Sequence, residues 1–174
     1  MGKTIFEFVR TAVYGIIIAL ILTCVFQPSR VQGTSMEPAV SDNSLVILNK
    51  ASYWMGMPAY DDIVIFKSTI YTDNGEGKML IKRVIGVEGD NIEIINGTVY
   101  RNKIMVNEDY VSGMNPQENM KEIKVKKGYV FVLGDHRDVS LDSRDKSIGQ
   151  VLVSDIVGKV SLRIYPFSEF GLIQ

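Results

Sequence analysis

The chain has 174 residues, and its 19 lysines and arginines nearly balance its 20 aspartates and glutamates. This balance gives no electrostatic reason to expect a nucleic-acid partner, because such partners require a basic surface. A single cysteine excludes an internal disulfide framework, and one cysteine with one histidine cannot form a thiolate-rich or multi-imidazole zinc site. The carboxylates do not follow calcium-loop spacing, so we expect neither a metal nor another cofactor.

The first predicted element is an apolar helix near the N-terminus. Residues 11–26, TAVYGIIIALILTCVF, carry no charge, and a helix of this length spans roughly 24 Å. Four apolar residues between positions 5 and 9 lengthen the stretch toward the ~30 Å of a bilayer core, and Arg10 can extend to the headgroups. One membrane-spanning helix explains the pattern best. A cleaved signal peptide and a buried soluble helix are the alternatives.

The charges beside this helix predict its orientation. Lys3 and Arg10 precede the uncharged run, against one acidic residue, Glu7. Because lysine and arginine are retained on the cytoplasmic side, the N-terminus is predicted to be cytoplasmic. We therefore expect a cytoplasmic N-terminus and transmembrane anchor at residues 1–28, with the bilayer as a partner. Residues 29–174 would form an extracytoplasmic domain of a single-pass protein in the cell membrane.

After Pro28 the pattern changes from helix to strand. Short segments rich in Val, Ile and Tyr alternate with Gly, Asn and Asp, which is typical of strands joined by turns. The predicted strand segments are 44–50, 61–68, 79–87, 91–106, 122–135 and 155–167. Within the fourth, Asn96-Gly97 predicts a tight hairpin turn. No helix of convincing length is expected after the anchor, so the predicted fold class is mainly β.

The stretch SYWMGMPAY at residues 52–60 fits neither a helix nor a strand well. It can be a loop packed on the core. It can equally be an aromatic patch at the membrane interface, where Trp and Tyr are enriched.

The segment GTSMEPAV at residues 33–40 is typical of a serine presented on a turn. If Ser35 is a nucleophile, a general base must accept its proton. The single histidine, His136, could serve in a Ser-His-Asp triad with Asp138 or Asp142, although no feature of the sequence places it near Ser35.

Lys82 is the second candidate base, and it interrupts the apolar strand MLIKRVIGV. Alternation places it on the same face as Leu80 and Val84, with Arg83 on the opposite face. An edge strand whose lysine extends into solvent would also explain this pattern. A neutral lysine can nevertheless accept a serine proton. Lowering its pKa from ~10.4 to ~7 requires roughly 4.6 kcal/mol, which burial among apolar side chains can supply.

Residues 134–149, GDHRDVSLDSRDKSIG, are dense in short polar side chains. They form either a polar turn or a loop that orients the serine and the lysine. In chain order, GTSMEP, IKRVIGVEGD and GDHRDVSLDSR behind an N-terminal anchor resemble bacterial type I signal peptidase, and the short length is similar to its Gram-positive form. DDIVIFK and GKVSLRIYPFSEF also fit, so the resemblance covers nearly the whole chain.

The resemblance implies roles for six residues of this chain. They are the nucleophile Ser35, the general base Lys82, Ser140 hydrogen-bonding the lysine, the structural pair Asp142 and Arg144, and Met36 shaping the substrate cleft. It also implies a β-rich Ser-Lys peptidase core carrying a small β insertion at roughly residues 89–127.

The activity implied by the resemblance is that of a membrane-bound serine endopeptidase. It would remove N-terminal signal peptides from exported preproteins through an acyl-enzyme, cutting after a small residue that has another small residue two positions earlier. The extended peptide would add as a strand along the site.

Several positions depart from the family pattern. Gly33 stands where some members carry a serine hydroxyl, Asp61 replaces a glycine, and His136 replaces an asparagine. One alternative function is a catalytically weak homologue that acts as an extracytoplasmic binding module. A self-cleaving repressor would need a DNA-binding domain in place of the anchor, and a non-enzymatic β domain would leave Lys82 unexplained.

Overall fold

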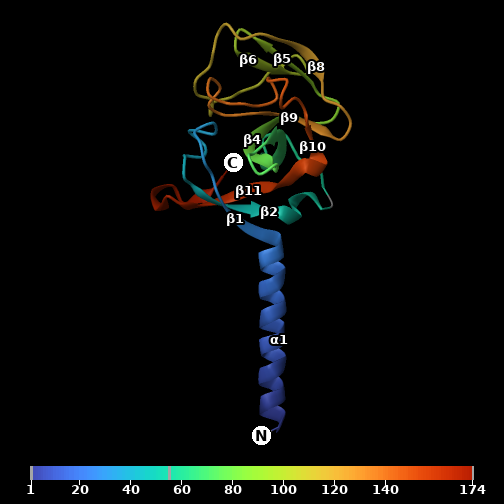
Figure 1. Ribbon diagram of the computed structural model, residues 1–174, viewed down its shortest axis with the longest axis vertical. Helices are drawn as coiled ribbons and strands as arrows, with labels where there is room; N and C mark the ends of the chain where they lie inside the picture. The colour runs from blue at the N-terminus through green and yellow to red at the C-terminus, as the bar shows by residue number, and fades with distance from the viewer. Residues whose placement is uncertain (1, 55, 174) are drawn as a thin grey trace.

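The computed structural model describes residues 2–54 and 56–173. Helix α1 (Gly2–Val25) extends away from a β domain formed by the described residues from Phe26 onward (Figure 1). Its 20-residue stretch Phe6–Val25 is long and apolar enough to cross a membrane, and none of it is buried within the protein. The predicted combination of one apolar helix and a mainly β fold is confirmed.

The larger sheet has eight strands, and all its neighbouring strands are antiparallel. In spatial order these are β1 (Phe26–Arg30), β2 (Leu45–Asn49), β11 (Ile156–Tyr165), β3 (Ile63–Tyr71), β4 (Gly77–Gly86), β9 (Tyr129–Leu133) and β10 (Val151–Leu152), with β12 (Gly171–Leu172) paired to β11. Strand β4 therefore lies inside the sheet, between β3 and β9.

A second, four-stranded sheet lies at the end of the domain furthest from α1 (Figure 1). Its order is β7 (Ile104–Met105), β6 (Thr98–Arg101), β5 (Asn91–Ile95) and β8 (Met120–Lys124). Asn96 and Gly97 connect β5 and β6 with φ angles of 50° and 80°. Positive φ at both central residues is what a tight two-residue hairpin turn requires, so the predicted turn is confirmed.

The helices after α1 in the described ranges are three short 3₁₀ turns. These are η1 (Lys50–Tyr53), η2 (Val153–Asp155) and η3 (Phe167–Glu169). The aromatic stretch is divided between two environments, because Tyr53 in η1 bonds the carboxylate of Asp62 while Trp54 is exposed. The described residues of the 52–60 stretch therefore favour neither interpretation throughout, and Met55 lies outside the described residues.

Some strand boundaries differ from the sequence expectation. The change from helix to strand falls at Phe26 rather than after Pro28, because Pro28 lies in the edge strand β1, where its missing N–H costs no interior hydrogen bond. The single segment predicted at 122–135 is two strands, β8 and β9, which belong to different sheets. Gly128, with φ of 76°, lies in the turn between them.

Strand β4 contacts all three hydrophobic clusters of the domain. Ile81 packs in the cluster that contains β2, Val84 in the cluster beneath β9 and β10, and Ile85 in the cluster shared with the second sheet. A strand held from several sides has little freedom to shift. Side chains on this part of β4 therefore have well-defined positions.

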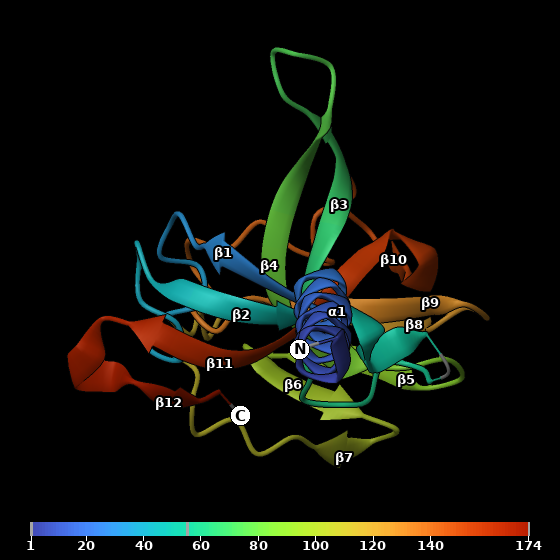
Figure 2. The same ribbon diagram turned by 90° about the horizontal axis from the view of Figure 1, so that it is seen from below.

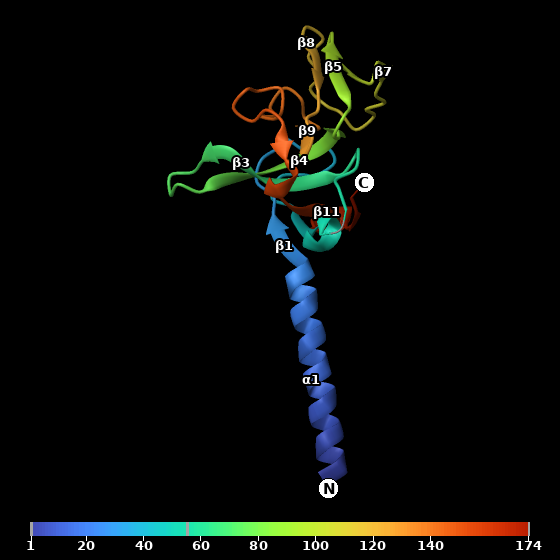
Figure 3. The ribbon, with the colours of Figure 1, turned by 90° about the vertical axis from the view of Figure 1, so that its right-hand side faces the viewer.

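The other half of β4 extends out of the body as a hairpin with β3. Figure 2, viewed along α1, shows this hairpin projecting from the domain, and Figure 3 shows it extending to one side of the helix axis. Strand β4 pairs with β3 over most of its length but with β9 only from Arg83 onward. The second edge of β4 at residues 78–81 therefore has no partner strand among the described residues.

Candidate active site

Ser35 lies on a compact turn that follows β1. The N–H of Glu37 donates to the carbonyl of Thr34 at 3.0 Å, and that of Val40 donates to Met36 at 2.8 Å. Gly33 precedes the turn with φ of 101°, a conformation that L side chains rarely adopt. The sequence pattern around the serine thus produces a real turn, with Ser35 partly exposed.

Lys82 approaches this turn from strand β4. Its Nζ lies 2.6 Å from Oγ of Ser35 and 2.8 Å from the carbonyl oxygen of Ile81. Only 2% of Lys82 is exposed, and its strand is interior to the sheet. The alternative in which this lysine extends into solvent from an edge strand is therefore wrong.

The environment of Lys82 favours its neutral form. Burial lowers the pKa of its amine from the usual 10.5 to about 8, and this effect outweighs the nearby negative charges of Asp142 and Asp135, which raise the pKa. A substantial fraction of the amine is therefore neutral near pH 8. The direction is the one expected from the sequence, and the shift is smaller than a pKa of ~7 would require.

The loop at residues 134–149 lies directly against the nucleophile. The N–H of His136 donates to the carbonyl of Ser35 at 3.1 Å. A Cβ on Gly134 would overlap both the hydroxyl of Ser140 and the carbonyl oxygen of Ser35, so only glycine allows this approach. The loop is thus packed backbone to backbone against the serine turn.

Asp142 and Arg144 fix the shape of this loop. The guanidinium of Arg144 donates from Nε and Nη2 to the two oxygens of Asp142, each at 2.8 Å. The same carboxylate accepts the N–H of Gly134 at 3.0 Å. The pair predicted from the sequence is therefore brought together, and it holds Gly134 next to Ser35.

Two other predicted residues have surroundings that differ from the expectation. The hydrogen bond from Ser140 to Lys82 is absent, and Oγ of Ser140 is buried without a partner among the described residues. Lys82 is instead engaged by Ser35 and Ile81. Met36 is fully buried in the hydrophobic core, so it presents no surface to a substrate here and can shape the site only from beneath.

The imidazole of His136 is not directed at the nucleophile. Its Nε2 lies 3.0 Å from a carboxylate oxygen of Asp138. Oγ of Ser35 is contacted by Lys82, and no hydrogen bond within the described ranges joins it to His136. The Ser-His-Asp arrangement is therefore not formed, although the backbone of His136 does lie beside Ser35.

Sequence reasoning missed a charged network on the other face of β4. Arg83 binds Asp135 through Nε at 3.0 Å and Nη2 at 2.8 Å, and Asp61 through Nη1 at 2.9 Å. The ring of Tyr110 lies 4.0 Å from its guanidinium carbon. Asp61 has φ of 75°, a conformation that glycine adopts more readily than other residues. The sequence feature that could have revealed this network was Arg83 itself, an arginine within an apolar strand directly next to the candidate base.

Within the described ranges, no group of three or more His, Cys, Asp or Glu side chains is arranged to hold a metal ion.

The backbone N–H of Ser35 is a further feature of the site. It donates to no acceptor among the described residues, whereas the N–H of Gly33 donates to Asp42 at 2.7 Å.

Comparisons with known proteins find similar peptidases. A family model described as "Signal peptidase, peptidase S26" matches residues 5–165. Signal peptidase IB of Staphylococcus aureus (strain COL) is 35% identical over 188 aligned residues, covering 98% of this chain and 94% of that protein. Thylakoidal processing peptidase 1, chloroplastic, of Arabidopsis thaliana is 36% identical over 150 residues, covering 82% of this chain and 43% of that protein. A crystal structure of a signal peptidase I from Enterococcus faecalis V583 is 29% identical with a TM-score of 0.49, over 60% of this chain and 97% of that one.

Proposed function

The chain belongs to the signal peptidase family, peptidase S26, and is a serine endopeptidase; from this membership we propose that it is a membrane-bound enzyme whose Ser35 and Lys82 form the catalytic dyad. Its substrates would be the signal peptides of exported preproteins. The observation that carries the proposal is the 2.6 Å contact between Oγ of Ser35 and Nζ of a lysine that is almost fully buried.

The dyad can perform acyl transfer with its own two groups. The neutral amine of Lys82 accepts the hydroxyl proton as Oγ of Ser35 attacks the scissile carbonyl. The resulting ammonium then donates that proton to the leaving amine, which frees the mature protein and leaves an ester on Ser35. Lys82, neutral again, activates a water molecule that hydrolyses the ester. Each proton that Lys82 takes is returned, so the cycle closes.

The negative oxygen that develops during attack needs a hydrogen-bond donor. The N–H of Ser35 is a candidate beside Oγ because it donates to no acceptor among the described residues, whereas Gly33 has no hydroxyl and its N–H donates to Asp42. Such a preorganised donor is worth about 2.7–4 kcal/mol in acyl-transfer enzymes. We therefore assign the oxyanion contact to the Ser35 amide.

The unpaired edge of β4 offers a binding position for an extended substrate. Residues 78–81 immediately precede Lys82, and β9 pairs with this strand only beyond it. An extended peptide that adds to this edge would gain backbone hydrogen bonds and would run directly past the dyad. Small side chains near the cut, as the family implies, would allow the peptide to approach closely.

The membrane anchor fits this function. Helix α1 continues directly into β1, so the catalytic domain is tethered within a few residues of the bilayer. The stretch Phe6–Val25 would span about 30 Å as a helix. The charges of Lys3 and Arg10 favour a cytoplasmic N-terminus and an extracytoplasmic catalytic domain, where exported substrates emerge.

The test of the activity is cleavage of a synthetic signal-peptide substrate by the detergent-solubilised full chain. Wild type should cut once, after the small residue of a small-x-small site, and Ser35→Ala should abolish cutting while the protein stays folded. Wild-type protein that binds the peptide without cutting it would refute the activity and favour the binding-module alternative. Turnover by Ser35→Ala near the wild-type rate would refute the nucleophile.

The orientation has its own test. Protease added to intact protoplasts should digest the β domain and leave the anchor. Full protection of the C-terminal end would overturn the proposed orientation without affecting the assignment of the dyad.

A further inference from the structure

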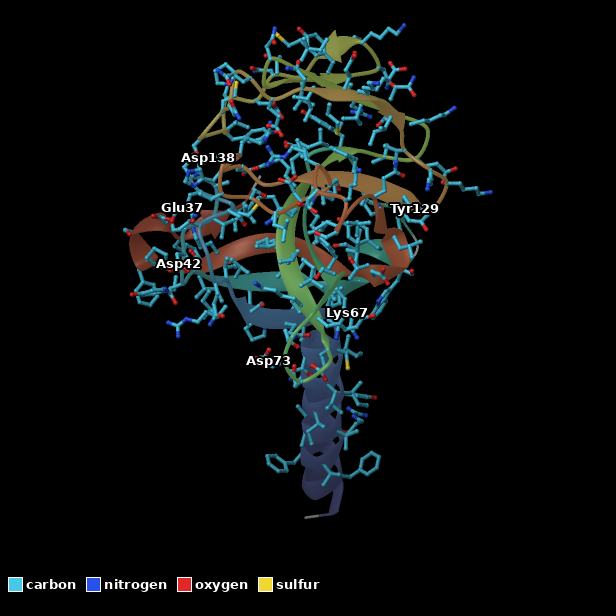
Figure 4. The ribbon with its side chains drawn as sticks, turned by 45° about the horizontal axis from the view of Figure 1, so that its top comes forward. Glu37, Asp42, Lys67, Asp73, Tyr129 and Asp138 are labelled. Carbon is cyan, nitrogen blue, oxygen red and sulfur yellow. The ribbon has the colours of Figure 1, made fainter. Side chains whose placement is uncertain are left out.

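A loop from the second sheet reaches the nucleophile. Residues 106–119, here called the clamp loop, connect β7 to β8. Ser112 in this loop forms an isolated parallel bridge with His136. In Figure 4, Glu37 and Asp138 lie near one another on the same side of the molecule, where the serine turn meets the loop that follows β9.

The backbone of Ser112 is bound to the segment that contacts Ser35. Its N–H donates to the carbonyl of Asp135, and its carbonyl accepts the N–H of Arg137, both at 2.9 Å. Between these two residues, His136 directs its N–H at the carbonyl of Ser35. The segment 135–137 therefore carries the clamp loop on one edge and the nucleophile on the other.

The hydroxyl of Ser112 also bonds the serine turn directly. Its Oγ donates to the carbonyl of Glu37 at 3.0 Å, two residues beyond the nucleophile. Three segments that are distant in the sequence thereby form a closed ring of hydrogen bonds around Ser35. Ser112 is the residue of the clamp loop that bonds both other segments.

Charged contacts hold the clamp loop in this position. Glu108 pairs with Arg137, and both side chains are buried. Glu118 pairs with Arg144 at 2.8 Å. Gly113 has φ of 64°, and a Cβ there would overlap the side chains of Asp138 and His136, so the approach requires glycine. The close contact is thus built into both loops.

We propose that the clamp loop completes the active site and that Ser112 is a positioning residue, which holds the turn of Ser35 at the correct distance from Lys82. Lys82 is held by an interior strand, but Ser35 lies on a turn whose position depends on contacts from outside it. Misplacement by about 1 Å can reduce rates about 100-fold, so a single bond to this turn can affect catalysis. The inference rests on the proposed dyad.

A matched pair of variants isolates the hydroxyl. Ser112→Thr retains the hydroxyl. Ser112→Val has nearly the same shape as the threonine variant but lacks the hydroxyl. We expect Ser112→Val to lower kcat roughly tenfold with KM within about twofold, because the turn of Ser35 loses one of the hydrogen bonds that hold it in place. Ser112→Thr should stay within about threefold of wild type. The assay is signal-peptide cleavage by the detergent-solubilised full chain.

Two further readouts separate positioning from general stability. The rising limb of the pH–rate profile should keep its midpoint in Ser112→Val, because the surroundings of Lys82 are unchanged. Ser154→Val, at an exposed serine of η2, is the control and should match wild type. If Ser112→Val does not fold, Ser112→Ala removes the hydroxyl without adding volume and should show the same loss of kcat.

Equal kcat values for the Thr and Val variants would overturn the positioning role, as would a loss that is confined to KM. An Ala variant with wild-type kcat would overturn it as well. These results differ from failure of the proposed function, in which the wild-type chain itself does not cut the substrate.

Discussion

The two faces of strand β4 carry adjacent basic side chains in different surroundings. Lys82 and Arg83 are both almost fully buried. Among the described residues, no carboxylate is in hydrogen-bond contact with Lys82, and its Nζ bonds a hydroxyl and a backbone carbonyl. Arg83 is paired with Asp135 and Asp61. The two buried cations therefore differ in their neighbours, because Arg83 has paired carboxylates and Lys82 does not.

The pKa values follow from this difference. Burial lowers the pKa of Lys82 to about 8 because no directly bonded acid compensates the lost hydration. Burial would also lower the pKa of Arg83, but the hydrogen bonds and charge of Asp135 raise it above its usual value. One residue can thus serve as a base, whereas the other remains a permanent cation that ties β4 to the start of the 134–149 loop. The comparison shows that the role of a buried basic residue depends on whether a carboxylate is bonded to it.

The largest expected effect tests the role of Lys82. Lys82→Met, which cannot accept a proton, should lower kcat/KM at least about a thousandfold, and Lys82→Arg should fail as well because a guanidinium does not deprotonate in proteins. Peptide cleavage measures the loss, and circular dichroism checks that both variants fold. Turnover by Lys82→Met near the wild-type rate would show that Lys82 is not the general base.

A large effect on stability is expected on the opposite face. Arg83→Met would remove the ion pair and both of its hydrogen bonds from the buried carboxylate of Asp135, and should lower the free energy of unfolding by about 3–5 kcal/mol. Chemical denaturation measures the change. Arg101→Met is the matched control, because its pair with Asp90 is more exposed and should contribute about 1 kcal/mol. Equal losses of unfolding free energy in Arg83→Met and Arg101→Met would contradict the special contribution of the buried Arg83–Asp135 pair.

The pH dependence of stability should sharpen the comparison. Between pH 8 and 10.5 the unfolded chain binds a proton at Lys82 that the folded chain has released, so this group makes stability rise with pH over that window. At pH 7 the lowered pKa costs about 3 kcal/mol, so Lys82→Met should be more stable than wild type by a similar amount. The difference in stability between Lys82→Met and wild type should narrow by about 2.5 kcal/mol between pH 7 and pH 10. Parallel stability curves for the two proteins would contradict a lowered pKa.

The smallest effect is expected from His136→Asn. The imidazole pairs with Asp138, and the contact to Ser35 comes from the backbone N–H, which the variant retains. Cleavage should stay within about threefold of wild type, and the rising limb near pH 8 should persist. Loss of that limb in His136→Asn would identify the imidazole as its source and would restore the histidine as a candidate base.

Several features of this protein are determined by local sequence. The uncharged run at residues 11–26 specifies an apolar helix without help from any other segment, because its hydrogen bonds are internal and its side chains need no protein partner. The Asn96-Gly97 turn likewise depends on two residues that tolerate positive φ. Alternation on residues 79–87 also indicated which face Lys82 occupies. For these features the physical cause lies within a few neighbouring residues.

Other features were decided only by tertiary structure. Whether β4 was an edge or an interior strand depended on β9, nearly fifty residues later in the sequence, which pairs with β4 from Arg83 onward. The lowered pKa of Lys82 likewise depends on its burial in the folded domain. The sequence separations of the Ser35–Lys82, Arg83–Asp135 and Glu37–Ser112 contacts are 47, 52 and 75 residues. No local pattern encodes such distances. They arise because the strands pair in one register and bring these segments together, so the candidate pair could be named from the sequence but its environment and the clamp loop could not.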